Sequence, residues 1–166
     1  MTPTHVRPGT RRDLAELVHI YNHYVVNSYA TFDTEPFTVE SRAAWLDRFS
    51  DVGPYRLLVA CHGDRVAGCA SSGPYRDHPA LARTVEVGIY LHPELRTRGI
   101  GSALYRSLLD SLRSEDVHVA LAGIALPNDA SVALHRKFGF KEVGVFEEYA
   151  VKNDSYISSL WMQLRL

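Results

Sequence analysis

The stretch Thr84-Val85-Glu86-Val87-Gly88-Ile89-Tyr90-Leu91, followed a few residues later by Arg96-Thr97-Arg98-Gly99-Ile100-Gly101, decides the fold of this 166-residue chain. In the first part apolar residues alternate with others, which predicts a strand with Val85 and Val87 on one face and Glu86 on the other. His92-Pro93 ends this strand. Leucines at positions 104, 108 and 112 then predict a helix over residues 100–112. A turn that contains two glycines therefore connects a strand to the beginning of a helix.

This turn, residues 96–101, has the properties of a pyrophosphate site. The first backbone N–H groups of a helix have no partner within the helix, and the helix dipole adds positive charge there. Glycines let phosphate oxygens approach the backbone, and Arg96 and Arg98 add cations. A dinucleotide-binding loop would need a third glycine where Leu104 stands, and the Gly-Lys-Ser/Thr of a Walker loop is absent. An ordinary glycine turn before a helix is the alternative for this hexapeptide alone.

The remaining chain predicts a mixed α/β sheet flanked by helices. The turn His62-Gly63-Asp64 indicates a hairpin, and the connection through the helix at 100–112 predicts a right-handed crossover between parallel strands. Besides the strand and helix above, we expect strands at 6–8, 56–61, 65–72, 117–124, 140–146 and 159–166, and helices beginning at Thr10, Thr38 and Asn128.

The composition excludes several classes of protein. The 18 Lys and Arg residues balance 19 Asp and Glu residues, which argues against nucleic-acid binding. No apolar run approaches the roughly 18 residues that span a bilayer, and the first residues lack the apolar segment of a signal peptide. Cys61 and Cys69 are too few for a disulfide scaffold or an all-cysteine zinc site. We therefore expect one cytoplasmic domain over residues 1–166, with no metal and with no nucleic-acid or membrane partner.

Several blocks in the same order resemble the GNAT superfamily of N-acetyltransferases, most closely its phosphinothricin and methionine sulfoximine acetyltransferase branch. The resemblance extends from Val6 to Gln163. It implies the GNAT fold, a mixed and mostly antiparallel sheet of about six to seven strands with splayed central parallel strands. It also implies acetyl-CoA as co-substrate and a homodimer. The matching blocks are residues 20–24, 32–36, 73–76, 84–86, 96–101, 126–131, 134–135 and 138–140.

The resemblance also assigns residues to the cofactor. The pantetheine arm would pair with the backbone of the strand at 89–91, and Asn128 would contact that arm. Alone, Asn128 is more simply a helix cap, and the two roles are compatible. Gly88 is either a neutral strand glycine or a bulge that splays its strand from residues 117–124. The cofactor residues implied are Ile89, Tyr90, Leu91, Arg96, Thr97, Arg98, Gly99, Ile100, Gly101, Ser102 and Asn128.

Two residues are candidates for proton transfer. An ammonium group has no lone pair with which to attack a thioester, so the reaction needs a proton acceptor, and the resemblance assigns that role to Glu86. The alternative is a solvent-facing carboxylate. His135 stands where many family members carry a tyrosine thought to protonate the departing thiolate. It could supply that proton, or it could be a packed helix histidine, because a thiol with a pKa of roughly 8.5 needs little help to leave.

The resemblance places Phe32, Tyr75, Arg76 and Lys152 near the acceptor. The donor fork of an arginine suits a carboxylate or phosphinate, although a loop arginine is usually solvated. The sequence thus predicts an acetyltransferase for the primary amine of a small amino acid or amino-acid analogue. The alternatives are a peptide or protein amine acetyltransferase and a non-catalytic acetyl-CoA-binding module.

Overall fold

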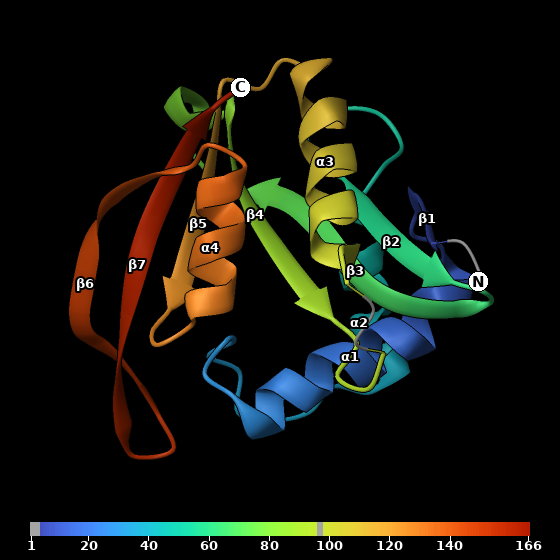
Figure 1. Ribbon diagram of the computed structural model, residues 1–166, viewed down its shortest axis with the longest axis horizontal. Coiled ribbons are helices and arrows are strands. Elements are labelled where there is room, and N and C mark those ends of the chain that lie inside the picture. Colours follow the sequence, from blue (N-terminus) through green and yellow to red (C-terminus); the bar gives the residue numbers. More distant parts are fainter. Residues whose placement is uncertain (1–3, 96–97) are drawn as a thin grey trace.

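The computed structural model describes residues 4–95 and 98–166, which form one sheet of seven strands in the order β1-β2-β3-β4-β5-β7-β6 (Figure 1). Strands β4 and β5 are parallel, and every other neighbouring pair is antiparallel. This mixed sheet confirms the predicted fold class. The strands are β1 (Thr4–Pro8), β2 (Leu57–His62), β3 (Arg65–Pro74), β4 (Thr84–Leu91), β5 (Val119–Ala125), β6 (Lys141–Lys152) and β7 (Ser155–Arg165).

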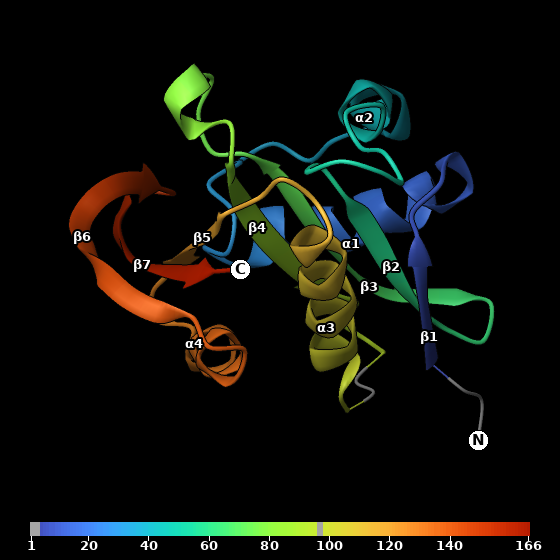
Figure 2. The same cartoon turned by 90° about the horizontal axis from the view of Figure 1, so that it is seen from above.

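Helices cover both faces of the sheet (Figures 1 and 2). Helices α1 (Leu14–Asn27) and α2 (Val39–Leu46) pack on one face. Helices α3 (Ile100–Arg113) and α4 (Asp129–Lys137) pack on the other face. Short 3-10 turns at Arg11–Asp13 and Pro79–Leu81 complete the elements. Among the described residues, no helix is both long and apolar enough to cross a membrane.

The alternation in β4 divides its side chains between two cores, as predicted. Val85 and Val87 join the core under α3, whereas Tyr90 packs against the core under α1. The three leucines that predicted α3 are fully buried in the first core. Strand β4 therefore carries its apolar side chains toward α3 and presents Glu86 and Tyr90 on the opposite face.

The hairpin of β6 and β7 is longer than the sequence analysis predicted. We expected strands only at 140–146 and 159–166, but pairing continues to Lys152 and Ser155. Asn153 and Asp154 both have positive φ angles, 50° and 60°, which suits a two-residue hairpin turn. A second difference is smaller: β3 extends to Gly73 and Pro74, two residues beyond the predicted strand at 65–72.

The parallel strands β4 and β5 separate soon after they meet. They pair only from Thr84 to Glu86, opposite Val119 to Leu121. Gly88 holds its regular register with Ser71 of β3, so the strands diverge without the bulge that we considered at Gly88. This splayed pair positions the candidate site.

Candidate active site

A narrow cleft of about 70 Å³ opens where β4 and β5 separate. His92 N–H donates to the Ala67 carbonyl across the β3 side, at 2.9 Å. Because backbone groups alternate in direction along a strand, those of Tyr90 also face β3, whereas those of Ile89 and Leu91 face the cleft. This arrangement agrees with the expectation for Ile89 and Leu91. The backbone of Tyr90 is turned toward the neighbouring strand, but Tyr90 also lines the cleft, so its contact with a cofactor stays a prediction.

The carbonyl of Leu91 already has a partner within the protein. The hydroxyl of Tyr24 donates to it at 2.7 Å. An extended ligand in the cleft can therefore reach three backbone groups of this segment: the N–H of Leu91 and the N–H and carbonyl of Ile89. An amide-rich ligand could pair with them as an added strand does.

The N-terminus of α3 begins with Gly99 in the left-handed region, at φ +87°. None of the described residues, 4–95 and 98–166, has an atom within 4 Å of the place where a Cβ at Gly99 would lie, so these residues leave space beside the free N–H groups of this helix end. Arg98 is exposed beside it. Arg96 and Thr97, which we also assigned to this site, lie outside the described residues.

Gly101 has a different reason to be glycine from the one the sequence suggested. It is buried, and a Cβ there would lie 3.3 Å from the Leu134 side chain of α4 and 3.7 Å from those of Ile89 and Leu91. Its missing side chain thus lets α3 pack on α4 and β4. Only its backbone N–H is a candidate for contact with a phosphate.

Sequence analysis missed a cation at this helix end. Nζ of Lys137 donates to Oγ of Ser102 at 2.8 Å. Lys137 is the last residue of α4, and nothing in the local sequence connects it with the loop at 96–102. The packing of α4 beside α3 brings this ammonium to the candidate pyrophosphate site.

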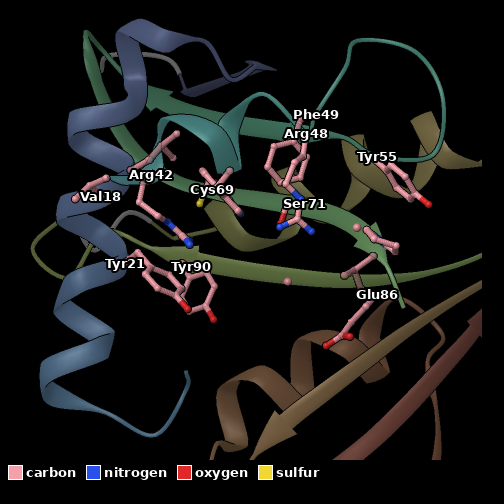
Figure 3. Close-up of a pocket in the computed structure, with 16 residues that line it drawn as sticks. Val18, Tyr21, Arg42, Arg48, Phe49, Tyr55, Cys69, Ser71, Glu86 and Tyr90 are labelled. Carbon is pink, nitrogen blue, oxygen red and sulfur yellow. The ribbon is translucent and has the colours of Figure 1, made fainter. Parts of the chain in front are cut away.

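A larger cavity of about 570 Å³ lies on the other face of β4, beneath α1 and α2 (Figure 3). Glu86 stands at one end of it. The cavity and the cleft share Val87, Gly88 and Tyr90, so the two spaces meet across β4. Partial enclosure raises the pKa of Glu86 above its ordinary value. A carboxyl group therefore faces the point where a ligand in the cleft and a ligand in the cavity would meet.

His135 is a packed histidine that is only 2% exposed. Its Nδ1 lies 2.7 Å from the carbonyl oxygen of Ser131, which can only accept, so Nδ1 carries the proton. Nε2 then accepts from the hydroxyl of Tyr105 at 2.8 Å. Burial lowers the pKa of His135 and raises that of Tyr105. Although both residues line the cleft, His135 directs its one proton at the backbone, which favours the packing alternative.

Asn128 has the capping role that the sequence predicted. Its side-chain oxygen accepts from the backbone N–H of Ser131 at 3.2 Å, at the beginning of α4. Asn128 also lines the cleft, so a contact with a bound ligand is compatible with the cap.

The predicted acceptor residues form a separate group at the edge of the site. Arg76 lies over the ring of Tyr75 at 5.1 Å, and Tyr75 in turn packs edge-on against Trp161. Phe32 packs edge-on against Tyr149. None of these residues lines the cavity itself, but Tyr75 and Arg76 directly follow Gly73 and Pro74, which do.

Lys152 is not available to an acceptor. Its side chain is 1% exposed, and its Nζ donates to the carbonyl oxygens of Ser28 and Thr31, both at 2.8 Å. The lysine thus ties the hairpin of β6 and β7 to the segment after α1. This corrects its assignment as a substrate-contacting residue, because the ammonium is buried and donates its hydrogen bonds to backbone carbonyls.

The cavity also contains charged side chains that the sequence analysis did not single out. Arg42 lies in α2, Arg48 follows that helix, and both line the cavity. The sequence analysis predicted the helix that begins at Thr38 but assigned no role to either arginine. The tertiary structure brings Arg42 and Arg48 into the same cavity as Glu86, and no local sequence pattern reveals this arrangement.

The cleft between β4 and β5 and the cavity beneath α1 and α2 meet beside a carboxyl group, an arrangement that suits an enzyme that brings two substrates together. Residues 17–140 match the model of the acetyltransferase (GNAT) family. The chain is 49% identical to a phosphinothricin N-acetyltransferase of Streptomyces coelicolor, over 95% of this chain and 94% of that protein. It is 32% identical to an L-methionine sulfoximine/L-methionine sulfone acetyltransferase of Salmonella typhimurium, over 97% of this chain and 94% of that protein.

A solved structure agrees with these relatives. The crystal structure of a GNAT superfamily phosphinothricin acetyltransferase from Sinorhizobium meliloti in complex with acetyl-CoA superposes with a TM-score of 0.92. It is 29% identical and covers 100% of this chain and 89% of that chain. The chain belongs to the GNAT family and is an N-acetyltransferase.

Proposed function

We propose that this enzyme transfers the acetyl group of acetyl-CoA to the primary amine of a small amino acid or amino-acid analogue of the phosphinothricin or methionine sulfoximine type. The observation that carries the proposal is the meeting of cleft and cavity across β4, beside Glu86. The names of the relatives support this acceptor class.

Glu86 is the proposed general base. Acetyl-CoA supplies a thioester whose carbonyl carbon is the electrophile. Enclosure raises the pKa of Glu86, which makes the carboxylate a stronger base toward an ammonium at neutral pH. The backbone N–H groups of Ile89 and Leu91 face the cleft, where they would polarise a carbonyl oxygen. We assign no essential proton-donor role to His135, because its proton faces the Ser131 carbonyl.

The pyrophosphate would lie at the N-terminus of α3. Its proposed ligands are the free N–H groups of residues 99–102 and the side chains of Arg96, Thr97, Arg98 and Ser102, with Lys137 adding a cation. The space that the described residues leave at Gly99 fits such a group. Asn128, which lines the cleft, would contact the pantetheine arm.

The acceptor would lie against the β3 end of the cavity. Arg76 is exposed and its guanidinium is held over Tyr75, so it can present its donors to a carboxylate or phosphinate. Phe32, 42% exposed, would close the apolar side of the same region. Lys152 acts there only indirectly, through its hydrogen bonds to the Ser28–Thr31 segment.

The enzyme is further proposed to be a cytoplasmic homodimer. Strand β6 is the edge of the sheet and exposes Val143, Val145, Phe146, Tyr149 and Val151. Several exposed apolar side chains on one edge strand are typical of a protein interface. Both cysteines are free and buried, which suits a reducing compartment. Light scattering measures the molar mass of the wild type, which should be that of a dimer, and of Val145→Lys, which should be that of a monomer. A monomeric wild type would contradict the proposed dimer.

The test of the proposed function is an acceptor screen in which acetyl-CoA consumption is followed as free thiol. Phosphinothricin, methionine sulfoximine and the common amino acids form one group, and short peptides with free N-termini form the other. Turnover of peptides alone would favour the peptide amine alternative. Cofactor binding by calorimetry without turnover of any amine would favour a non-catalytic module.

Glu86→Gln tests the base. General-base catalysis supplies roughly 10²–10⁴-fold, so kcat at pH 7 should fall at least about tenfold, with cofactor affinity unchanged. The loss should shrink as the pH approaches the pKa of the amine. Because the pKa of Glu86 is raised, the acid limb of kcat/KM in the wild type should lie above pH 4.5. Asp64→Asn, in the turn between β2 and β3, is the matched control; near-normal kcat in Glu86→Gln would place the base elsewhere.

A further inference from the structure

The acceptor cavity holds two arginines that the proposed chemistry does not use. Arg42 and Arg48 both line it, and neither forms an ion pair with any residue among 4–95 and 98–166. Glu86 is the one acidic residue among the residues that line the cavity, and it stands at the opposite end (Figure 3). The far part of the cavity therefore carries positive charge without a counterion from the cavity lining.

Arg42 packs among three aromatic rings at this far end. Its guanidinium carbon lies 4.6 Å from the centre of the Tyr21 ring and 4.5 Å from the centres of both Phe37 and Trp45. Tyr21 packs edge-on against Tyr90, with ring centres 5.1 Å apart. Aromatic faces orient the planar group but leave the N–H donors at its rim free to bind an anion.

Arg48 lies between Arg42 and Glu86. In Figure 3 it is drawn between these two side chains, and Arg48 lines the cavity together with Ser71, which pairs with Gly88 of β4. Each residue of an extended strand advances about 3.3 Å, so Gly88 is ~7 Å and Tyr90 ~13 Å from Glu86 along β4. The end of the cavity beside Tyr90, where Arg42 packs through Tyr21, is thus about 13 Å along the strand from Glu86, and Arg48 lines the space between these ends.

We propose that Arg42 and Arg48 form a second anion subsite, which binds a carboxylate at the far end of an elongated acceptor. The inference rests on the proposed function, because it takes Glu86 as the position of the amine. A free amino acid carries its carboxylate next to its amine and does not reach either arginine. An extended peptide spans about 3.3–3.6 Å per residue, so the C-terminal carboxylate of a dipeptide reaches Arg48 and that of a tri- or tetrapeptide approaches Arg42.

The walls between the two ends fit the middle of such a peptide. Leu17, Val18, Trp45 and Phe49 line the cavity between or beside the arginines. These apolar side chains would contact small apolar peptide side chains and strengthen the attraction between charges by excluding water. The acceptor class that the subsite selects is therefore a short apolar peptide with a free amine and a free C-terminal carboxylate.

The experiment compares alanyl-leucine and alanyl-alanyl-leucine with their C-terminal amides, which differ only in the carboxylate. The ratio of kcat/KM for acid and amide is measured in the wild type, in Arg42→Gln and in Arg48→Gln. Arg106→Gln is the control, because it removes an exposed arginine from α3 on the other face of the sheet. Calorimetric binding of the same peptides provides a readout that does not need turnover.

The wild type should prefer the acid roughly three- to tenfold, between the value of an exposed ion pair and that of a charge-assisted hydrogen bond. Arg48→Gln should remove the preference for the dipeptide and Arg42→Gln that for the tripeptide, while Arg106→Gln keeps both. Equal kcat/KM and equal binding of acid and amide in the wild type would overturn the subsite, and so would a preference that survives both substitutions. Acetylation of free amino acids, measured in parallel, reports separately on the proposed function.

Discussion

Replacing Tyr105 with Phe tests whether the Tyr105–His135 pair supports the fold or the chemistry. The substitution removes one hydroxyl that is fully buried and donates to Nε2 of His135 at 2.8 Å. The ring and its contacts with Phe138 and Phe140 stay in place. The change therefore isolates one hydrogen bond in the core under α3.

The expected loss follows from what is left behind. Nε2 of His135 becomes a buried acceptor without a donor, which costs about 1–3 kcal/mol. For a chain of this length each kcal/mol lowers Tm by roughly 2–4 °C, so Tm should fall by roughly 2–12 °C. kcat, measured well below this Tm, should stay within about twofold, because a thiol with a pKa of roughly 8.5 leaves without an acid.

Thermal unfolding by circular dichroism and kcat from thiol release are measured on the same preparations. Tyr156→Phe, at a tyrosine that is 71% exposed, is the control and should change neither quantity. A tenfold loss of kcat with an unchanged Tm would refute the reasoning. That result would make the pair a proton donor to the departing thiolate.

Three further changes test the site. Arg76→Ala should raise the KM of the acceptor roughly 10- to 150-fold and leave that of acetyl-CoA nearly unchanged, since a charged hydrogen bond contributes about 1.5–3 kcal/mol; equal effects on both would indicate general damage. Gly101→Val should cost about 1–3 kcal/mol of stability, because its Cβ would crowd Leu134, and it should weaken calorimetric CoA binding only by shifting the N-terminus of α3; an unchanged Tm would contradict that packing. Lys152→Met should lower Tm and raise the acceptor KM by loosening residues 28–31. Burial lowers the pKa of Lys152, so the folded protein loses this proton at a lower pH than the unfolded chain does. The contribution of Lys152 to the free energy of unfolding should therefore grow from neutral pH toward the ordinary lysine pKa of 10.5. If the free energies of unfolding of wild type and variant differ by the same amount at every pH, the burial of the charge is contradicted.

The sequence predicted the elements that have a local signal. Alternation gave the bounds of β4, and the leucine spacing gave the buried face of α3. The caps at Thr38 and Asn128 were visible because a short polar side chain stands directly before each helix. The length of the last hairpin could not be predicted in this way, because its turn depends on positive φ angles at Asn153 and Asp154 and contains no glycine.

The parts of the candidate site formed by residues close together in the sequence could be predicted. The parts formed by side chains from distant elements could not. Glu86 and the glycines at 99 and 101 lie on one continuous stretch, so their relation could be read from the sequence. Lys137 reaches Ser102 from another helix, and Lys152 reaches Thr31 from the last hairpin. The role of a long, flexible side chain depends on which element packs beside it, and no spacing within the sequence encodes that.

The separation of β4 and β5 has a consequence for the motion of the enzyme. The two halves of the sheet, β1–β4 and β5–β7, are joined by a seam of only three residue pairs. Unpaired backbone in the middle of a sheet opens at low free energy, so amide hydrogens on both sides of the seam should exchange faster than those between β2 and β3. A cofactor bound there as we propose would act as a removable strand, and at 100 times its Kd it would stabilise the chain by about 2.7 kcal/mol. Substrate supply would then set how tightly the enzyme is held together.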